Sequence, residues 1–323
     1  MKVVITDYWY ENLDEEKKIF AAVKGLQLEA HHCKDEEQLC RLVRDADAVI
    51  VQFAPMTQRV IDSMGKCRII VRYAIGVDNI DLDAATAKGI YVANVPDYSI
   101  DEVSNHAITL LMALSKKLIP LAASVKAGLW DYTISKPLYR MRGKTLGLIG
   151  FGRIPCMVAE KMRGFGVNIQ CYDPYIRKDL ADKYGVMPVS LQTLLETSDY
   201  ISVHCPLTKE TYHMLNRDAF ARMKNTALLI NTARGPIVEE AALLEALQNQ
   251  RIAGAALDVV EHEPIQKDSA LLTLDNVIVT PHNAWYSEDA IATLQRSVAE
   301  EVVRVLTGHR PKNLVNKAVL EMG

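Results

Sequence analysis

The sequence predicts an α/β protein with two doubly wound parallel-sheet domains. Short β-rich runs alternate with amphipathic segments of helical length along nearly all of the chain, which is typical of βαβ units. This alternation occurs in two blocks, and a glycine-bearing turn follows the first strand of the second block. A chain of 323 residues is long enough for two such domains.

Each block supplies enough strands for its own sheet. The first block has five predicted strands, at residues 2–7, 26–32, 47–53, 68–73 and 89–95. The second has six, at residues 145–150, 167–173, 200–206, 227–231, 253–259 and 276–282. Six parallel strands complete a dinucleotide-binding sheet, so the second block predicts a Rossmann domain.

Two helical segments define the domain organisation. The run 101–128 is long and apolar on one face, and we expect it to cross from one domain to the other. The amphipathic segment 287–308 follows the last strand and is expected to pack on the first block. These segments predict a Rossmann domain of residues 100–287, inserted in a smaller flavodoxin-like domain of residues 1–99 and 288–323. The irregular stretch 130–143 is the best candidate for an arm or subunit contact.

The turn GFGRIP, residues 150–155, is most of a dinucleotide fingerprint. Gly150 permits the tight turn and Gly152 permits a close approach to a pyrophosphate, which the amides of Arg153 and Ile154 would bind at the helix N-terminus. Pro155 replaces the expected third glycine. Proline is tolerated in a first helical turn, so we expect it to remove one possible donor without abolishing the site.

Asp173 ends the next predicted strand, 21 positions after Gly152 (173 − 152). An acid at that distance is expected to bond the adenosine ribose hydroxyls. It would also repel a 2′-phosphate, by up to ~4 kcal/mol for like charges about 4 Å apart at an effective dielectric of 20. We therefore expect NAD, rather than NADP, as the cofactor.

Polar residues follow the later strands of the second block. Arg234 follows strand 227–231, Glu261 and Glu263 follow Asp258, and His282 ends the last strand segment. Ligands of open α/β sheets lie outside the carboxyl ends of the strands. An arginine, a carboxylate and a histidine can thus meet beside a nicotinamide.

The chain resembles the D-isomer-specific 2-hydroxyacid dehydrogenases. The matching stretches are RYAIGVDNIDLDAA, NVPDYSIDEVSNHA, GLIGFGRI with Asp173, HCPLTKET, LLINTARGPIVEEAALLEAL, AALDVVEHEP and TPHNAWYS, in order from about Arg72 to Ser287. Within the family, RIIVR, DNIDL and PHNAWYSEDA look most like the branch of the C-terminal binding proteins, which are NAD(H)-dependent corepressors.

The resemblance implies three catalytic residues. Arg234 would hold the substrate carboxylate and polarise the carbonyl, a bidentate task that suits a guanidinium. His282 would exchange a proton with the carbonyl or hydroxyl oxygen, and Glu263 would orient its ring. Glu261 competes with Glu263, but the residue before Pro264 matches the family motif, which favours Glu263.

The resemblance also implies binding residues. For the cofactor, these are Asp258 at the nicotinamide carboxamide, Thr232 after strand 227–231, and His204, Pro206 and Thr208 at the adenine end. For the substrate, they are the loop amides of Ala74, Ile75 and Gly76, together with Trp285 as a wall of the pocket.

Two functions from different classes follow. The intact Arg–Glu–His set favours an NAD-dependent oxidoreductase that interconverts a small D-2-hydroxy acid and its 2-keto acid. The alternative is an NAD(H)-responsive, corepressor-like binding protein with little turnover, and the set itself does not separate the two. The pattern leaves the identity of the acid open.

The bulk properties favour a cytoplasmic protein. The net charge of −3 and pI of about 6.3 suggest neither nucleic acid nor an anionic membrane as a partner. The apolar runs are strand-sized, and the N-terminus lacks a signal-peptide pattern. We expect no metal site, because the pair His31–His32 has no cysteine or carboxylate cluster in support. The family resemblance implies a homodimer.

Overall fold

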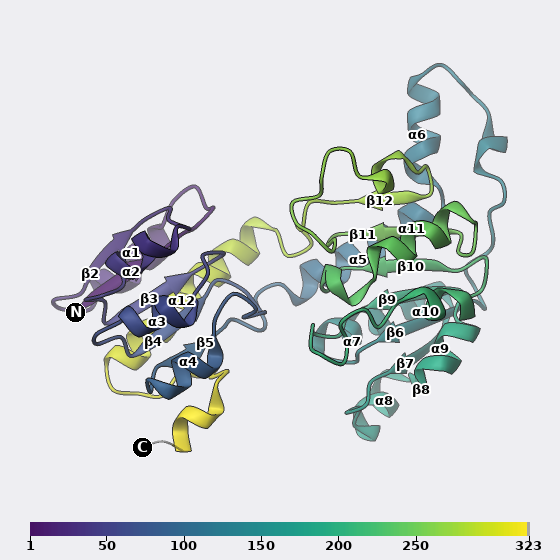
Figure 1. The fold of residues 1–323 in the computed structure, drawn as a ribbon. Helices are drawn as coiled ribbons and strands as arrows, with labels where there is room; N and C mark the ends of the chain where they lie inside the picture. The colour runs from purple at the N-terminus through teal and green to yellow at the C-terminus, as the bar shows by residue number, and fades with distance from the viewer. Residues whose placement is uncertain (322–323) are drawn as a thin grey trace. The chain divides into compact units, whose positions relative to one another are not determined.

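The computed structural model describes residues 1–321, which form two compact units. Unit 1 contains Met1–Ser99 and the chain from Tyr286 onward, and unit 2 contains Ile100–Trp285. The predicted second crossing, between residues 287 and 288, lies two positions after the observed one. Both units are α/β with parallel sheets, which confirms the predicted fold class (Figure 1).

Unit 1 is built on a five-stranded parallel sheet in the order β2-β1-β3-β4-β5. Its strands are β1 (Lys2–Ile5), β2 (Gln27–Ala30), β3 (Ala48–Val51), β4 (Ile69–Arg72) and β5 (Tyr91–Ala93). Its helices are α1 (Asp14–Ala21), α2 (Glu36–Leu42), α3 (Gln58–Ser63), α4 (Leu82–Ala87), α12 (Glu288–Leu306) and the 3₁₀ turn η5 (Lys317–Glu321). This strand order is that of flavodoxin-like sheets.

The C-terminal segment completes unit 1. Helix α12 packs against α1, and Gln295 Nε2 donates to the Asn12 carbonyl at 2.8 Å. Further along, Asn316 Oδ1 accepts from the amide of Val92 at 2.8 Å, beside the end of the sheet. Both ends of the chain therefore build this unit.

Unit 2 is built on a seven-stranded parallel sheet in the order β12-β11-β10-β9-β6-β7-β8. Its strands are β6 (Thr145–Ile149), β7 (Asn168–Tyr172), β8 (Met187–Pro188), β9 (Tyr200–Val203), β10 (Leu228–Asn231), β11 (Gly254–Leu257) and β12 (Val277–Val279). Taken without β12, this is the 3-2-1-4-5-6 order of a Rossmann sheet, with the switch point between β6 and β9.

Helices cover both faces of this sheet. They are α5 (Ile100–Ser115), α7 (Arg153–Met162), α8 (Lys178–Tyr184), α9 (Leu191–Thr197), α10 (Arg217–Arg222) and α11 (Glu240–Gln248), joined by the 3₁₀ turns η2 (Arg163–Phe165), η3 (Gly235–Ile237) and η4 (Ala270–Thr273). The neighbours Leu229 and Ile230 belong to two different core clusters, the first with Leu243 and the second with Leu110. Successive strand residues point to opposite faces, so each face has its own core.

The helical run predicted at 101–128 consists of two helices. Helix α5 ends at Ser115, and α6 (Leu118–Lys126) begins after Lys117, which adopts a left-handed φ of +50°. The two axes differ by 61°. Among the described residues no single helix is long and apolar enough to cross a bilayer, and only this bent pair has the length and composition. Helix α5 is a core helix of unit 2, with Leu110, Leu111 and Leu114 buried.

One strand was not predicted. Strand β8 contains only Met187 and Pro188, which pair with Gln170 and Cys171 of β7 at the sheet edge. Two residues that include a proline give no periodicity from which a strand can be predicted. Proline is tolerated here because the strand lies at an edge.

Candidate functional site

The glycine turn lies at the switch point of the unit 2 sheet. Gly150 has a φ of +88°, and a Cβ there would lie 2.7 Å from the backbone nitrogen of Cys205. A side chain at this position would therefore push apart the loops that follow β6 and β9. Gly152 is the N-cap of α7, and a Cβ there would meet nothing within 4 Å. The backbone before Arg153 and Ile154 is thus open to a ligand.

Pro155 is the third residue of α7 and is buried. It lies in the first turn, where its missing N–H leaves no intrahelical bond unmade. The helix continues for seven further residues to Met162. The helix therefore accommodates this proline in its first turn, and its effect on the cofactor site stays a prediction.

Asp173 follows β7 directly and faces the glycine turn. Its Oδ2 accepts from the Phe151 amide at 2.8 Å, and its Oδ1 accepts from the Tyr175 amide at 2.8 Å. The carboxylate is therefore held beside the turn that would receive a pyrophosphate. This is the place where an acid can reach an adenosine ribose.

The segment after β9 lies against the same turn. The amide of His204 donates to the Ile149 carbonyl at 2.7 Å, and its ring Nε2 lies 2.8 Å from Ser202 Oγ. Burial lowers the pKa of His204 to about 3, so this ring is neutral at physiological pH. Pro206 and Thr208 are exposed further along the same segment.

The hydroxyl of Thr232 indicates a ligand contact at this edge of the sheet. It follows β10 directly, and its buried Oγ1 has no hydrogen-bond partner among the described residues. Buried polar atoms are normally satisfied, so a missing partner indicates an unfilled contact. Together with the open backbone at Gly152 and the carboxylate of Asp173, this hydroxyl fits a bound dinucleotide.

Arg234 lies on a tightly held turn after β10. Asn231 Nδ2 donates to the Arg234 carbonyl at 3.0 Å, and Asn231 Oδ1 accepts from the Ala233 amide at 3.0 Å. The Arg234 guanidinium donates from Nη1 to the Ala233 carbonyl at 2.8 Å. Asn231 is a residue that the sequence analysis missed. The sequence feature that could have identified it is its position as the last residue of a buried strand.

His282 and Glu263 form the predicted pair. His282 Nδ1 lies 2.7 Å from Glu263 Oε2, and the histidine side chain is 39% exposed. Since an ionised carboxylate only accepts hydrogen bonds, Nδ1 carries the hydrogen and Nε2 is left for a substrate oxygen. Trp285 Nε1 donates to the His282 carbonyl at 2.9 Å, so the tryptophan also holds this segment.

Asp258 supports the segment that carries His282. Its carboxylate accepts from Thr280 Oγ1 at 2.5 Å and from the amides of Asn283 at 3.1 Å and Ala284 at 2.8 Å. Burial acts to raise its pKa, but the hydrogen bonds, with His106 foremost, outweigh burial and hold the pKa below its usual value. These bonds give Asp258 a positioning task, and its contact with the nicotinamide stays a prediction.

His106 and Thr280 belong to the same network. His106 Nε2 lies 3.0 Å from Thr280 Oγ1 and 3.4 Å from Asp258 Oδ1. Thr280 was not predicted as a site residue, although it stands two positions before His282. A hydroxyl that bridges residues far apart in the chain leaves no local pattern in the sequence.

The predicted substrate loop lies in unit 1, at the carboxyl end of β4. The Ala74 carbonyl accepts from the Val95 amide at 3.0 Å, and the Ile75 carbonyl accepts from Asn94 Nδ2 at 2.6 Å. These two bonds hold the loop that continues to Gly76. Its role in substrate binding stays a prediction.

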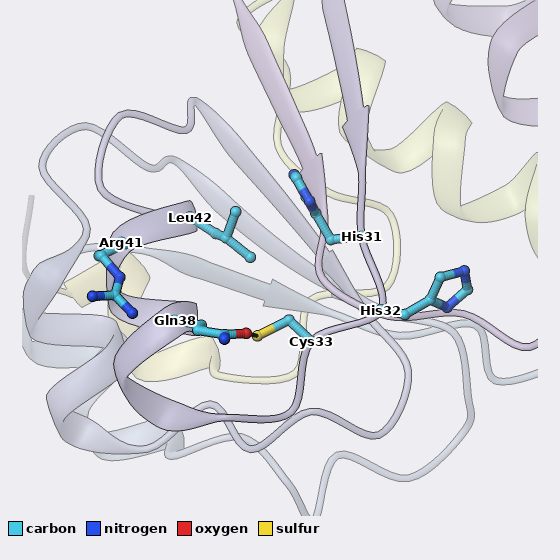
Figure 2. Close-up of a pocket in the computed structure, with 6 residues that line it drawn as sticks. All are labelled: His31, His32, Cys33, Gln38, Arg41 and Leu42. Carbon is cyan, nitrogen blue, oxygen red and sulfur yellow. Dashed lines mark hydrogen bonds between the residues drawn. The ribbon is translucent and has the colours of Figure 1, made fainter.

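His31 and His32 lie beside a pocket of about 280 Å³ at the end of β2. Figure 2 shows that their rings point in different directions, with His31 turned along the strands and His32 turned away from them. The pocket is also lined by Cys33, whose thiol donates to Gln38 Oε1 at 3.3 Å. Residues 1–321 contain no group of three or more side chains suited to hold a metal ion.

Comparison with known proteins assigns the family. Residues 108–284 match the family model of the D-isomer specific 2-hydroxyacid dehydrogenases, NAD binding domain. The chain belongs to this dehydrogenase family. Its membership makes unit 2 an NAD-binding domain and the chain an NAD-dependent oxidoreductase.

Three relatives illustrate the range of the family. A glyoxylate reductase of Korarchaeum cryptofilum is 41% identical over 284 residues, 87% of this chain and 86% of that protein. A D-3-phosphoglycerate dehydrogenase of Methanocaldococcus jannaschii is 41% identical over 318 residues, 98% of this chain but 59% of that protein. The structure of a D-lactate dehydrogenase from Aquifex aeolicus, complexed with NAD and lactic acid, has a TM-score of 0.86 at 31% identity and covers 95% of this chain and 96% of that one.

Proposed function

We propose that this dehydrogenase interconverts a small D-2-hydroxy acid and its 2-keto acid, with His282 and Glu263 as the acid–base pair. The observation that carries the proposal is the 2.7 Å contact between His282 Nδ1 and Glu263 Oε2. Two relatives, named glyoxylate reductase and D-lactate dehydrogenase, support a small 2-keto acid as substrate.

Each residue has one task in this proposal. The guanidinium of Arg234 binds the substrate carboxylate, since its fork matches two carboxylate oxygens. When bound, NADH supplies the hydride for the carbonyl carbon. His282 donates the proton on Nε2 to the carbonyl oxygen, and Glu263 keeps the ring oriented and stabilises its positive charge.

We propose that the protein is a homodimer and that α6 and the segment after it form the interface. Helix α6 has no buried residue, and it extends away from the rest of unit 2 (Figure 1). The following segment exposes 90% of Trp130 and 73% of Tyr132. Large aromatic side chains are enriched in interfaces, and clustered exposure of this kind indicates a partner surface.

The substitution His282→Ala tests the assigned chemistry. We expect turnover of 2-keto acids to fall by about 10²–10⁴-fold, because positioned acid–base catalysis contributes that much. NADH binding, measured by fluorescence, should persist because His282 lies outside the glycine turn. Unchanged turnover in the variant would remove His282 from the mechanism.

The alternative function, that of an NAD(H)-responsive, corepressor-like binding protein, remains a prediction. Tight NADH binding by the unmodified protein, without turnover of any 2-keto acid, would favour that alternative. NADH-dependent binding of a peptide partner would then be the next measurement.

A further inference from the structure

The loop after β11 carries two carboxylates, and each contacts its own histidine. Glu263 contacts the proposed acid–base histidine, His282, at 2.7 Å. Two residues earlier, Glu261 Oε1 lies 2.6 Å from Nε2 of His213, a residue that the proposed mechanism does not use. The second pair is only partly exposed, with 29% of the His213 side chain and 16% of the Glu261 side chain accessible. A short, mostly buried contact between a histidine and a carboxylate needs an explanation of its own.

Glu261 holds its loop to the start of α11. Its Oε2 accepts from the Glu240 amide at 2.9 Å, while its own amide donates to Glu240 Oε2 at 3.2 Å. Burial acts to raise the pKa of Glu261, but the Glu240 amide and His213 outweigh it, and His262 adds a smaller effect, so the pKa is lowered. Glu261 is therefore ionised at neutral pH, although the Glu240 carboxylate lies beside it.

The same loop is in contact with the turn that carries Arg234. A Cβ on Gly235 would lie 1.8 Å from the Val260 carbonyl oxygen, so only glycine permits this approach. The Val260 amide in turn donates to Glu263 Oε1 at 3.3 Å. The backbone next to Glu261 therefore contacts both the Arg234 turn and the carboxylate that orients His282.

His213 belongs to this arrangement through its backbone as well. Its amide donates to the Pro236 carbonyl at 2.9 Å, and its φ is +50°. The first two of the segments around residues 213, 235–240 and 260–263 are thus joined by a backbone bond, and the last two by the bonds between Glu240 and Glu261. The His213–Glu261 contact joins the first segment to the third.

We propose that His213 and Glu261 are a positioning pair. The pair fixes the position of the loop that carries Glu263 relative to the turn that carries Arg234. The inference rests on the proposed function, because it assigns the pair's task to the His282–Glu263 contact. Their effect is on the orientation of Glu263 and, through it, on the tautomer of His282.

The test compares four variants of the full chain. Glu261→Ala removes both side-chain contacts, whereas Glu261→Gln retains an acceptor for the Glu240 amide and a polar group at His213. Glu245→Ala is the matched control, since it removes a carboxylate that pairs with Arg217 on the exposed face of α11. His213→Asn removes the histidine of the pair instead of the carboxylate, and asparagine tolerates a positive φ.

Two readouts are measured on each variant. The first is kcat on a 2-keto acid, together with NADH affinity. The second is the tautomer of His282, read from its ring ¹⁵N shifts in histidine-labelled protein. The second readout needs no substrate, so it decides this inference even if the wild-type chain turns over no 2-keto acid and the proposed function fails.

We expect Glu261→Ala to lower kcat by about 10- to 100-fold, the effect of a displacement of about 1 Å in a reacting group. NADH affinity should stay within about twofold, and His282 should lose its single Nδ1–H tautomer. Glu261→Gln should restore most of both readouts, and Glu245→Ala should match the wild type. If Glu261→Ala does not fold, His213→Asn should show the same changes. A wild-type tautomer in the folded variants of the pair would overturn the proposal.

Discussion

At the scale of single residues, His282 is held by more than its carboxylate. Its backbone adopts a φ of +54°, a region that non-glycine residues seldom occupy. Its amide donates to the Asp258 carbonyl at 2.8 Å, and its carbonyl accepts from Trp285. Strained backbone of this kind persists only where the surroundings enforce it, and it is concentrated at functional sites.

The carboxylate of Asp173 should set the choice between NADH and NADPH. We expect Asp173→Asn to lower the NADH-to-NADPH ratio of kcat/KM by at least about tenfold, because loss of one charge removes about 1–4 kcal/mol of repulsion. The asparagine oxygen can still accept from the Phe151 amide. Asp179→Asn, on the exposed side of α8, is the control and should leave the ratio unchanged. An unaltered ratio in Asp173→Asn would mean that another group excludes the phosphate.

The neutral ring of His204 predicts a dependence of stability on pH. Its pKa of about 3 in the folded state lies below the value of about 6.5 in an unfolded chain. Below pH 6.5 the unfolded state therefore binds a proton that the folded state does not, and the free energy of unfolding falls by up to about 1.4 kcal/mol per pH unit. Above pH 6.5 this contribution is constant.

The substitution His204→Gln isolates this effect, because glutamine can still bond Ser202 but does not titrate. Urea unfolding between pH 6.5 and 5 should show a smaller loss of stability in the variant than in the wild type. Equal slopes for the two proteins would show that His204 is protonated in the folded state.

At the scale of elements, two turns with little freedom build the site. The loop after β11 contacts the turn after β10 at Gly235, and the loop after β9 contacts the turn after β6 at Gly150. These are the carboxyl ends of parallel strands, where α/β sheets bind their ligands. The positions of the polar residues therefore follow from the strand order.

Gly235→Ala should break the contact between the loop after β11 and the turn after β10. A methyl group 1.8 Å from the Val260 carbonyl must displace one backbone segment, so we expect activity to fall by about 10²-fold or more. We expect the loss of stability to be about 1–3 kcal/mol, as for other overpacked sites. Gly164→Ala is the control, because a Cβ there meets nothing within 4 Å. A fully active Gly235→Ala protein would show that the two turns are not coupled.

The sequence predicted those features that follow from a local pattern of residues. Apolar runs predicted the strands, and the residues that follow them gave Arg234, Glu263 and His282. The pattern did not show the break at Lys117, since lysine is a good helix former and nothing local requires its positive φ. It also left out Asn231 and Thr280, whose bonds depend on which loops the fold brings together. Choosing Glu263 over Glu261 required a family motif, because both carboxylates contact a histidine.

At the scale of the whole molecule, α6 and the segment after it, here called the arm, are the proposed dimer interface. We expect Trp130→Glu to shift a dimer to monomers, as measured by light scattering after size exclusion, because a charge would be placed in an aromatic interface. Trp9→Glu is the control, since Trp9 in unit 1 is 73% exposed but lies outside the arm. A wild-type protein that is monomeric at all concentrations would contradict the proposed interface.

The proposed reaction is the reduction of a 2-keto acid by NADH, with His282 as the proton donor. The most direct measurement follows NADH oxidation by the wild type and by His282→Ala across a panel of 2-keto acids, with NADH binding measured in parallel. We expect turnover of at least one acid by the wild type, a loss of about 10²–10⁴-fold in the variant, and similar NADH affinity in both. Equal turnover by the two proteins, or none by a wild type that binds NADH tightly, would contradict it.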